Sequence, residues 1–280
     1  MASAARDGLR RSSMSIPRLH LPMIEPEDVV RHLGKEEKHW KARRSAHALT
    51  NLWFAANALP SSVQSIFAGH PIFRSAVLID AFFERQVDLG TAGRHSQTDL
   101  LAIVGLESQI AIVAVEGKAG ESFGQYVREW RDGSAGKERR LQALCATLCI
   151  SVEAAMPLRY QLLHRAASAI YEAKRYRSKL SIMLIQSFSD DDESFADFAA
   201  FLRTIGLTND AKRGVLFGPV ECDGQSFYAG WIDEKPPKKG EGLSYLDDLR
   251  LYADKLSLWC DRVRGWVDSR KQAETMRRAD

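Results

Sequence analysis

The chain has 280 residues, of which 45% are hydrophobic and 27% charged, and its formal net charge at pH 7 is +3. A chain of this length can bury a full core without disulfides, and its composition excludes an intrinsically disordered protein. No apolar stretch is long enough to span a bilayer, so we expect no membrane partner. The small net charge neither requires nor excludes a nucleic-acid partner.

The N-terminal part of the chain is predicted to be helical after a basic tail. Residues 1–20 are basic, rich in Ser and Ala, and lack the apolar region of a secretory signal, so we predict a flexible tail there. The helices predicted next cover residues 25–33, 36–58, 61–67 and 72–87. The last of these is apolar on almost every side, which is typical of a buried helix.

Two short apolar runs, 99–106 and 110–116, change the character of the sequence. They are rich in Ile, Val, Leu and Ala with few polar interruptions. Near-continuous apolar strands are buried on both faces, which indicates a sheet covered by helices on both sides. The elements predicted after them are helices over 123–130, 137–148 and 158–176, a third buried strand over 180–188, and an acidic-capped helix from 190 to 202.

The C-terminal part is predicted to contain a hairpin and a long helix. Strands over 214–220 and 226–233 are joined by Asp223-Gly224, a strong turn signal, and Pro219 favours an edge strand. Apolar residues at spacings of three and four predict a helix over 243–267. Because neither a repeat nor a long linker is visible, we predict a single domain over residues 21–270, with its core at about 72–188 and a tail at 271–280.

Charged side chains gather at the ends of the two apolar runs. If these runs form a hairpin that turns at Glu107-Ser108, Asp99 and Glu116 are equidistant from the turn and lie opposite each other. Side chains alternate between faces along a strand, so Glu116 and Lys118 project to the same side. All three should therefore converge at one end of the sheet. The competing interpretation is that they are solvated strand ends.

These residue types in this arrangement are suited to metal-assisted chemistry. Two neighbouring carboxylates repel each other, and Mg²⁺ or Mn²⁺ relieves that repulsion while accepting oxygen ligands. The metal can polarise a phosphoryl oxygen and lower the pKa of a bound water. Lys118 could then stabilise the negative charge that develops at phosphorus, and the carbonyl of Gly117 is a further hard oxygen donor.

At these positions the sequence resembles the PD-(D/E)XK, or restriction-endonuclease-like, superfamily. The residues that carry the resemblance are Thr98-Asp99 on one strand and Glu116-Gly117-Lys118 on the next. The resemblance covers roughly residues 72–188, and Thr98 departs from the Pro found in the superfamily pattern. It implies an α/β (α+β) fold ordered α-β-β-β-α-β, a mixed central sheet flanked by helices, here with added N-terminal and C-terminal helices. It also implies Asp99 and Glu116 as metal ligands and Lys118 as the catalytic lysine.

Many members of that superfamily carry another acidic residue on the helix before the sheet. By this resemblance Glu84 is a further metal ligand, and Asp80, one helical turn earlier, is the competing choice. An ion pair of Glu84 with Arg85 or Arg74 is the structural alternative.

Several exonuclease-like members also carry a Gln on the helix after the Glu-x-Lys strand. Gln161 fits this role, whereas the Tyr that often follows it four residues later is replaced by Arg165. Arg165 could face the same substrate phosphate, and Arg159 and Tyr160 are candidates for nucleic-acid binding on the same basic segment. A solvated basic helix face is the competing interpretation of this segment.

The sequence thus predicts a bacterial-type, cytoplasmic, Mg²⁺- or Mn²⁺-dependent nuclease that hydrolyses phosphodiester bonds, with DNA favoured over RNA as the partner. Its four cysteines show no metal-site spacing and fit buried thiols in a reducing cytoplasm. A homodimer is left open. The alternatives are a catalytically inactive nuclease-fold module that binds nucleic acid or a protein, and a plain interaction protein whose terminal helices dock a partner.

Overall fold

The computed structural model describes residues 25–33, 44–91 and 95–234. The strands are β1 (Val77–Val87), β2 (Ser96–Gly105), β3 (Ile110–Lys118), β4 (Leu180–Ser187), β5 (Leu216–Cys222) and β6 (Gln225–Asp233). The helices are α2 (Ser45–Ala56), α3 (Ser61–Ala68), α4 (Val127–Trp130), α5 (Ala135–Thr147), α6 (Val152–Ala155), α7 (Tyr160–Arg175) and α8 (Asp192–Thr204). Two 3-10 helices are η1 (Pro26–His32) and η2 (Pro71–Phe73).

The six strands form one mixed sheet in the order β1-β2-β3-β4-β6-β5. Strands β1, β2 and β3 form an antiparallel meander, and β3, β4 and β6 are parallel. The connection from β3 to β4 contains helices α4 to α7. β5 returns antiparallel to β6 through a turn at Asp223 and Gly224, both with positive φ. The predicted hairpin is confirmed, as is the edge position of the strand that contains Pro219.

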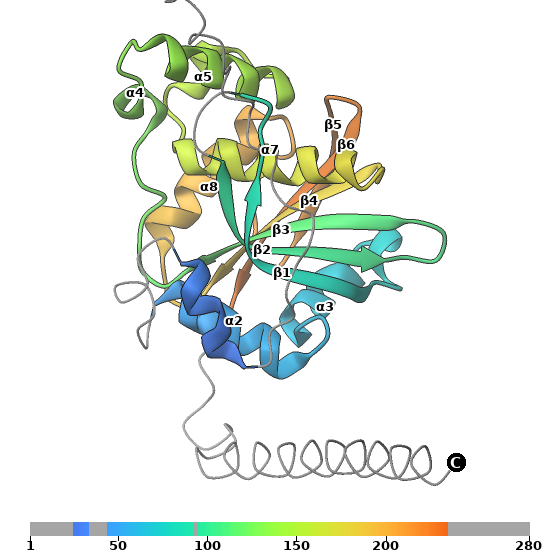
Figure 1. The fold of residues 1–280 in the computed structure, drawn as a ribbon. Coiled ribbons are helices and arrows are strands. Elements are labelled where there is room, and N and C mark those ends of the chain that lie inside the picture. The colour runs from blue at the N-terminus through green and yellow to red at the C-terminus, as the bar shows by residue number, and fades with distance from the viewer. Residues whose placement is uncertain (1–24, 34–43, 92–94, 235–280) are drawn as a thin grey trace, which may run out of the picture. The chain divides into compact units, whose positions relative to one another are not determined.

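Helices cover both faces of the sheet, as Figure 1 shows. On one face Leu101 and Ile103 of β2 share a buried cluster with residues of α5, α7 and α8. On the other face Leu100 and Ala102 pack with residues of α2 and α3. The alternation of adjacent β2 residues between the two clusters follows from the two-residue period of a strand. The predicted class, a mixed sheet flanked by helices, is therefore confirmed.

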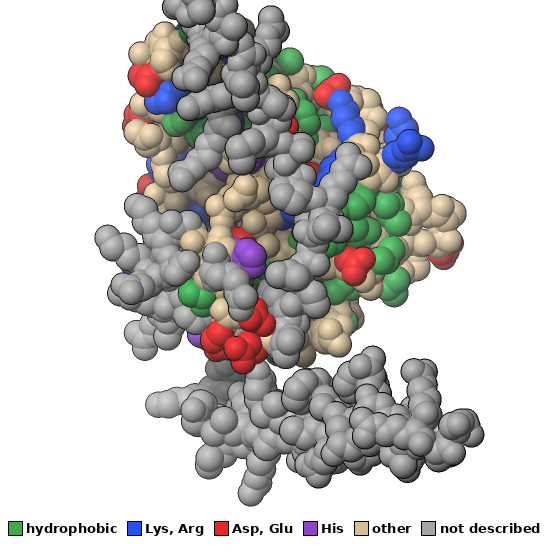
Figure 2. Space-filling model, in the orientation of Figure 1, with side chains coloured by type: hydrophobic (Ala, Val, Ile, Leu, Met, Phe, Trp, Pro, Cys, Tyr) green, Lys and Arg blue, Asp and Glu red, His purple; other side chains and the backbone are tan. Residues whose placement is uncertain are grey.

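The prediction of a buried helix over residues 72–87 is wrong, because this segment forms η2 and the edge strand β1. Short apolar runs rich in β-branched and aromatic residues suit a strand as well as a helix, and periodicity alone does not separate them. Nor is β1 buried on all sides. Val77 and Ile79 are 61% and 51% exposed, and Figure 2 shows hydrophobic side chains at the surface on this side of the molecule.

Several predicted bounds also change. The helix predicted over 25–33 is present as the 3-10 helix η1, and the helix predicted over 123–130 shortens to α4. The compact unit that contains the sheet ends at Glu234. The tail at 1–20, the start of the helix predicted over 36–58, the helix predicted over 243–267, the domain boundary at 270 and the tail at 271–280 lie outside the described residues. Within the described part of the chain, no helix is both long and apolar enough to cross a bilayer.

Candidate functional site

Three carboxylates lie at the same level of three neighbouring strands. The pairs that bracket them are Phe83↔Leu100 and Arg85↔Thr98 between β1 and β2, and Leu100↔Val115 between β2 and β3. This register places Glu84, Asp99 and Glu116 side by side, and we call these three residues the acidic row. The backbone N–H of Gly117 donates to Asp99 Oδ2 at 2.9 Å and so links β3 to β2 there. The predicted hairpin register is thus confirmed.

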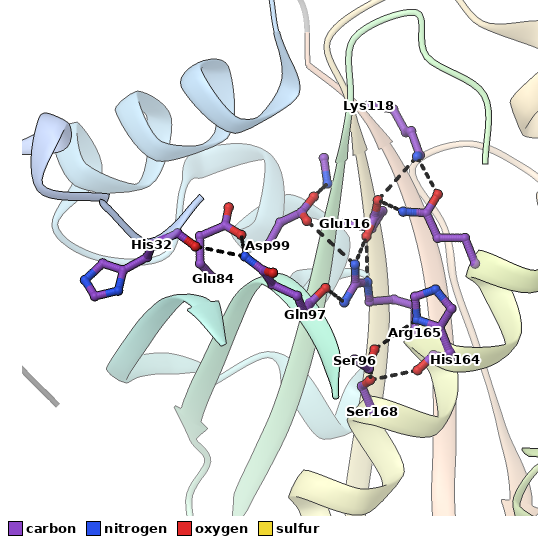
Figure 3. A network of polar contacts seen from close by, with 12 residues as sticks. His32, Glu84, Ser96, Gln97, Asp99, Glu116, Lys118, His164, Arg165 and Ser168 are labelled. Carbon is purple, nitrogen blue, oxygen red and sulfur yellow. Dashed lines mark hydrogen bonds and ion pairs between the residues drawn. The ribbon is translucent and has the colours of Figure 1, made fainter. Parts of the chain in front are cut away.

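Glu84 has an unusual backbone at the outer end of the row. Its φ is +51°, in the left-handed region that non-glycine residues seldom occupy. The residue pairs between β1 and β2 include its neighbours Phe83 and Arg85 but not Glu84 itself. Its side chain accepts a 2.6 Å hydrogen bond from Gln97 Nε2, which also donates to the carbonyl of His32 in η1 (Figure 3). Such strained positions cluster at functional sites, where the surroundings hold them in place.

The strands β2 and β3 separate at the acidic row, and Arg165 fills the gap. β2 pairs with β3 only from Leu100 onward, whereas β3 continues past Glu116 paired with β4. From α7, Arg165 donates its Nε to Glu116 Oε2 at 2.6 Å and its Nη1 to the carbonyl of Gln97 at 2.6 Å. Its Nη2 forms ion pairs with Glu116 and, at 3.6 Å, with Asp99 Oδ1. Figure 3 shows the guanidinium between the two carboxylates.

Lys118 and Gln161 engage the other oxygen of Glu116. Gln161 Nε2 donates to Glu116 Oε1 at 2.5 Å, and Lys118 Nζ lies 3.3 Å from the same oxygen. Lys118 Nζ also donates to Gln161 Oε1 at 2.9 Å and lies 4.5 Å from the centre of the Phe123 ring. The side chains of Lys118 and Glu116 are each only 3% exposed. Strand alternation therefore brings this pair to one face, as predicted, and α7 contributes Gln161.

The three carboxyl groups of the acidic row have different proton affinities. Burial and the neighbouring Asp99 raise the pKa of Glu84 to about 8, and burial and the neighbouring Glu116 raise the pKa of Asp99 to about 7. Burial also acts to raise the pKa of Glu116, but Arg165 and Lys118 outweigh it and the net shift is downward. Glu116 is therefore the most acidic of the three carboxyl groups. In the absence of another cation, Asp99 is close to half protonated near neutral pH and Glu84 is mostly protonated.

A known family model matches the part of the chain that contains all the described residues. The model of a domain of unknown function, DUF6946, matches residues 22–236. The chain belongs to this family. No curated protein and no solved structure is significantly similar to it. The whole acidic row lies inside the DUF6946 domain.

Two other predicted residues of the DUF6946 domain are engaged in internal contacts. Arg159 donates to Asp197 Oδ2 at 2.7 Å and to the Gly124 carbonyl at 2.6 Å, and its guanidinium lies over the Tyr126 ring. These contacts tie the segment before α4 to α8.

Tyr160 stacks on Trp130 with ring centres 3.9 Å apart, and its hydroxyl accepts from Arg140 Nε at 2.7 Å.

Asp80, the competing choice to Glu84 as a metal ligand, is exposed on β1, at a point where the pairing of β1 with β2 is irregular.

Sequence reasoning missed a polar group beside the acidic row. His164 Nδ1 lies 2.9 Å from Ser96 Oγ, and Ser168 Oγ lies 2.9 Å from the same oxygen. Burial is the main cause that holds the pKa of His164 well below its usual value, and the nearby positive charge of Arg165 adds to it, so the ring is neutral at pH 7. Gln97 was also missed. The spacing of His164 three residues after Gln161 could have indicated a shared helix face, but nothing in the sequence pointed to Ser96 or Gln97.

The donor chemistry of the acidic row suits a hard divalent cation. Among the described residues there is no ready-made cluster of three or more His, Cys, Asp or Glu ligands. Yet the charge of Asp99 raises the pKa of Glu84 and the charge of Glu116 raises the pKa of Asp99, and this is the repulsion that Mg²⁺ or Mn²⁺ relieves. At Gly117 the backbone of β3 lies close to α2, since a Cβ there would lie 3.3 Å from the Ser45 Cβ.

Proposed function

We propose that this chain hydrolyses phosphodiester bonds of nucleic acid with the help of Mg²⁺ or Mn²⁺, as the PD-(D/E)XK nucleases it resembles do. The observation that carries the proposal is the acidic row on three adjacent strands, with Lys118 held against its ionised member, Glu116. Carboxylates that are buried, as Glu116 is, or partly buried, as Glu84 and Asp99 are, are costly unless they are paired or bind a cation. Their concentration at one level of the sheet therefore favours a functional role.

The residues proposed to hold the metal are Glu84, Asp99, Glu116 and the carbonyl of Gly117. When bound, Mg²⁺ polarises a phosphoryl oxygen and makes a water molecule more acidic. Lys118 is the proposed catalytic residue, because its ammonium can stabilise the negative charge that develops on the phosphoryl group. Gln161 accepts from Lys118 and donates to Glu116. We propose that it positions both side chains.

The proposed partner is nucleic acid, with DNA favoured over RNA. Arg159 and Tyr160 border the N-terminal end of α7 next to Gln161. Arg159 also pairs with Glu193, whose side chain is 82% exposed. A phosphate could replace this exposed partner at little cost. A phosphate contact by Arg165 would require its guanidinium to leave Glu116.

A cytoplasmic location and a homodimer also remain proposals. The exposed Val77 and Ile79 on the edge strand β1 support self-association, because apolar sheet edges tend to pair. Light scattering of the wild type and of Ile79→Lys would test it. A monomeric wild type would exclude the homodimer.

One observation favours a second function, an inactive nuclease-fold module that binds nucleic acid or a protein. Both carboxylate oxygens of Glu116 already have partners, namely Arg165 on Oε2 and Gln161 and Lys118 on Oε1. Because these carboxylate oxygens already have hydrogen-bond and ion-pair partners within the protein, the acidic row can keep its arrangement without a metal. The fold alone does not guarantee activity.

The test is cleavage of a mixed set of DNA and RNA substrates with Mg²⁺ or Mn²⁺, comparing the wild type with Glu116→Gln and Lys118→Met. The matched control is Lys137→Met, which removes a partly exposed lysine of α5 that pairs with Asp132. We expect both site variants to lose cleavage by about 10²-fold or more while the control retains it. A folded wild type that binds nucleic acid but cleaves nothing would leave the binding module as the function.

A further inference from the structure

The guanidinium of Arg165 contacts two members of the acidic row, Glu116 and Asp99. Its side chain is 2% exposed and is among the largest fully buried side chains of the described chain. Three of its nitrogens contact the row or the backbone of β2, so the guanidinium lies between the strands where they separate. Arginine stays protonated under all ordinary conditions, which makes this positive charge permanent.

We infer that Arg165 is the resident cation of the acidic row, and that a divalent cation binds there in competition with its guanidinium. The inference rests on the proposed metal-dependent function, and it assigns a regulator of cation affinity to that site. Two positive charges on the same carboxylates repel each other, and this repulsion is strong at a buried position.

The contacts of Arg165 are unequal, which indicates where competition begins. Its bonds to Glu116 are short, whereas its ion pair with Asp99 is 3.6 Å long. Asp99 keeps 22% of its side chain exposed, and Glu84 lies beside it on the outer strand. Glu84 and Asp99 are therefore the residues that would hold a divalent cation with the least disturbance of Arg165, and Glu116 is the residue for which the two cations would compete.

A purely structural role for Arg165 predicts the opposite result from a competing role. If Arg165 only holds the row in shape, its removal loosens the ligands and weakens cation binding. If it competes, its removal frees carboxylate oxygens and strengthens cation binding. The sign of the change in affinity separates the two.

The experiment is calorimetric titration of the full chain with Mn²⁺, without nucleic acid, for the wild type, Arg165→Gln, Arg165→Lys and Arg175→Gln. The last variant is the matched control, because Arg175 is on the same helix and pairs with Glu172, outside the row. We expect Arg165→Gln to bind Mn²⁺ at least about tenfold more tightly than the wild type. Arg165→Lys, which retains the charge, should stay near the wild-type affinity, as should Arg175→Gln.

An Arg165→Gln affinity equal to or weaker than that of the wild type overturns the inference, while Mn²⁺ binding by the wild type leaves the proposed function standing. Absence of Mn²⁺ binding in all variants overturns both. If Arg165→Gln does not fold, the Arg165 Nε–H resonance of the wild type decides the matter, assigned by its loss in Arg165→Lys. Competition predicts that Mg²⁺ shifts this resonance, and an unchanged resonance at saturating Mg²⁺ overturns the inference.

Discussion

The raised pKa values in the acidic row make the stability of the metal-free protein depend on pH. Burial and Glu116 raise the pKa of Asp99 to about 7, well above that of an unfolded carboxyl. The folded state therefore binds more protons than the unfolded state, so the free energy of unfolding falls as pH rises through about 7. For Asp99 alone the fall between about pH 5.5 and 8.5 amounts to about 2 kcal/mol.

This figure is an upper limit for Asp99, since 22% of its side chain contacts solvent. Glu84 changes in the same direction, because its pKa is raised to about 8 by burial and by Asp99. The two shifts share one repulsion and do not add in full. Mg²⁺ bound by the row would oppose the fall, because it favours the ionised carboxylates.

The assay is urea denaturation in the presence of EDTA, followed by tryptophan fluorescence at about pH 5.5 and 8.5. Asp99→Asn should be less sensitive to pH than the wild type, because the amide does not ionise and no longer disfavours the charge of Glu84. Asp80→Asn is the matched control, as Asp80 is exposed on the same strand as Glu84. A wild-type stability that is constant or rises over this range would refute the reasoning, as would an equal slope in Asp99→Asn.

Three further substitutions should lower the free energy of unfolding, measured by the same denaturation assay. Glu116→Ala should cost about 3 to 5 kcal/mol, because two buried cations lose their shared carboxylate. Trp53→Phe removes the 2.7 Å hydrogen bond from its indole to the buried Gln186 and should cost about 1 to 3 kcal/mol. Gly218→Ala should cost about 3 kcal/mol, because φ is +138° and a Cβ would lie 2.5 Å from the Tyr228 ring.

Two of these predictions have a matched control. Glu107→Ala removes an exposed carboxylate at the β2–β3 turn, and it should change stability by less than about 0.5 kcal/mol. Gly206→Ala introduces a side chain at positive φ into open space, so it should cost only about 1 to 2 kcal/mol. Equal losses in a variant and its control would mean that the specific contact does not matter.

Local patterns in the sequence were sufficient to predict the register of the two central strands and the face on which their charged side chains lie. The distance of Asp99 and Glu116 from their common turn predicts the observed register, because an antiparallel hairpin pairs residues equidistant from its turn. Alternation along a strand predicts that Lys118 and Glu116 share a face. The turn at Asp223-Gly224 and the edge position of Pro219 follow from backbone preferences that act over a few residues.

Tertiary structure alone decided the nature of the segment over 72–87. Its apolar residues fit a helix or a strand equally well, and pairing with β2 selects the strand. That pairing also places Glu84 level with Asp99, whereas Asp80, an acidic residue of the same segment, pairs with Ile103.

The electrostatic state of the site was likewise beyond the sequence. Arg165 and Glu116 are 49 positions apart, and Gln97 reaches His32 over 65 positions. Such contacts depend on where β2 and β3 separate and on how α7 crosses the sheet, which no local periodicity encodes. The sequence by itself determined which charged groups the strand ends carry. The packing of α7 into the gap decided which of the three carboxyl groups ionises most readily and which cation contacts it.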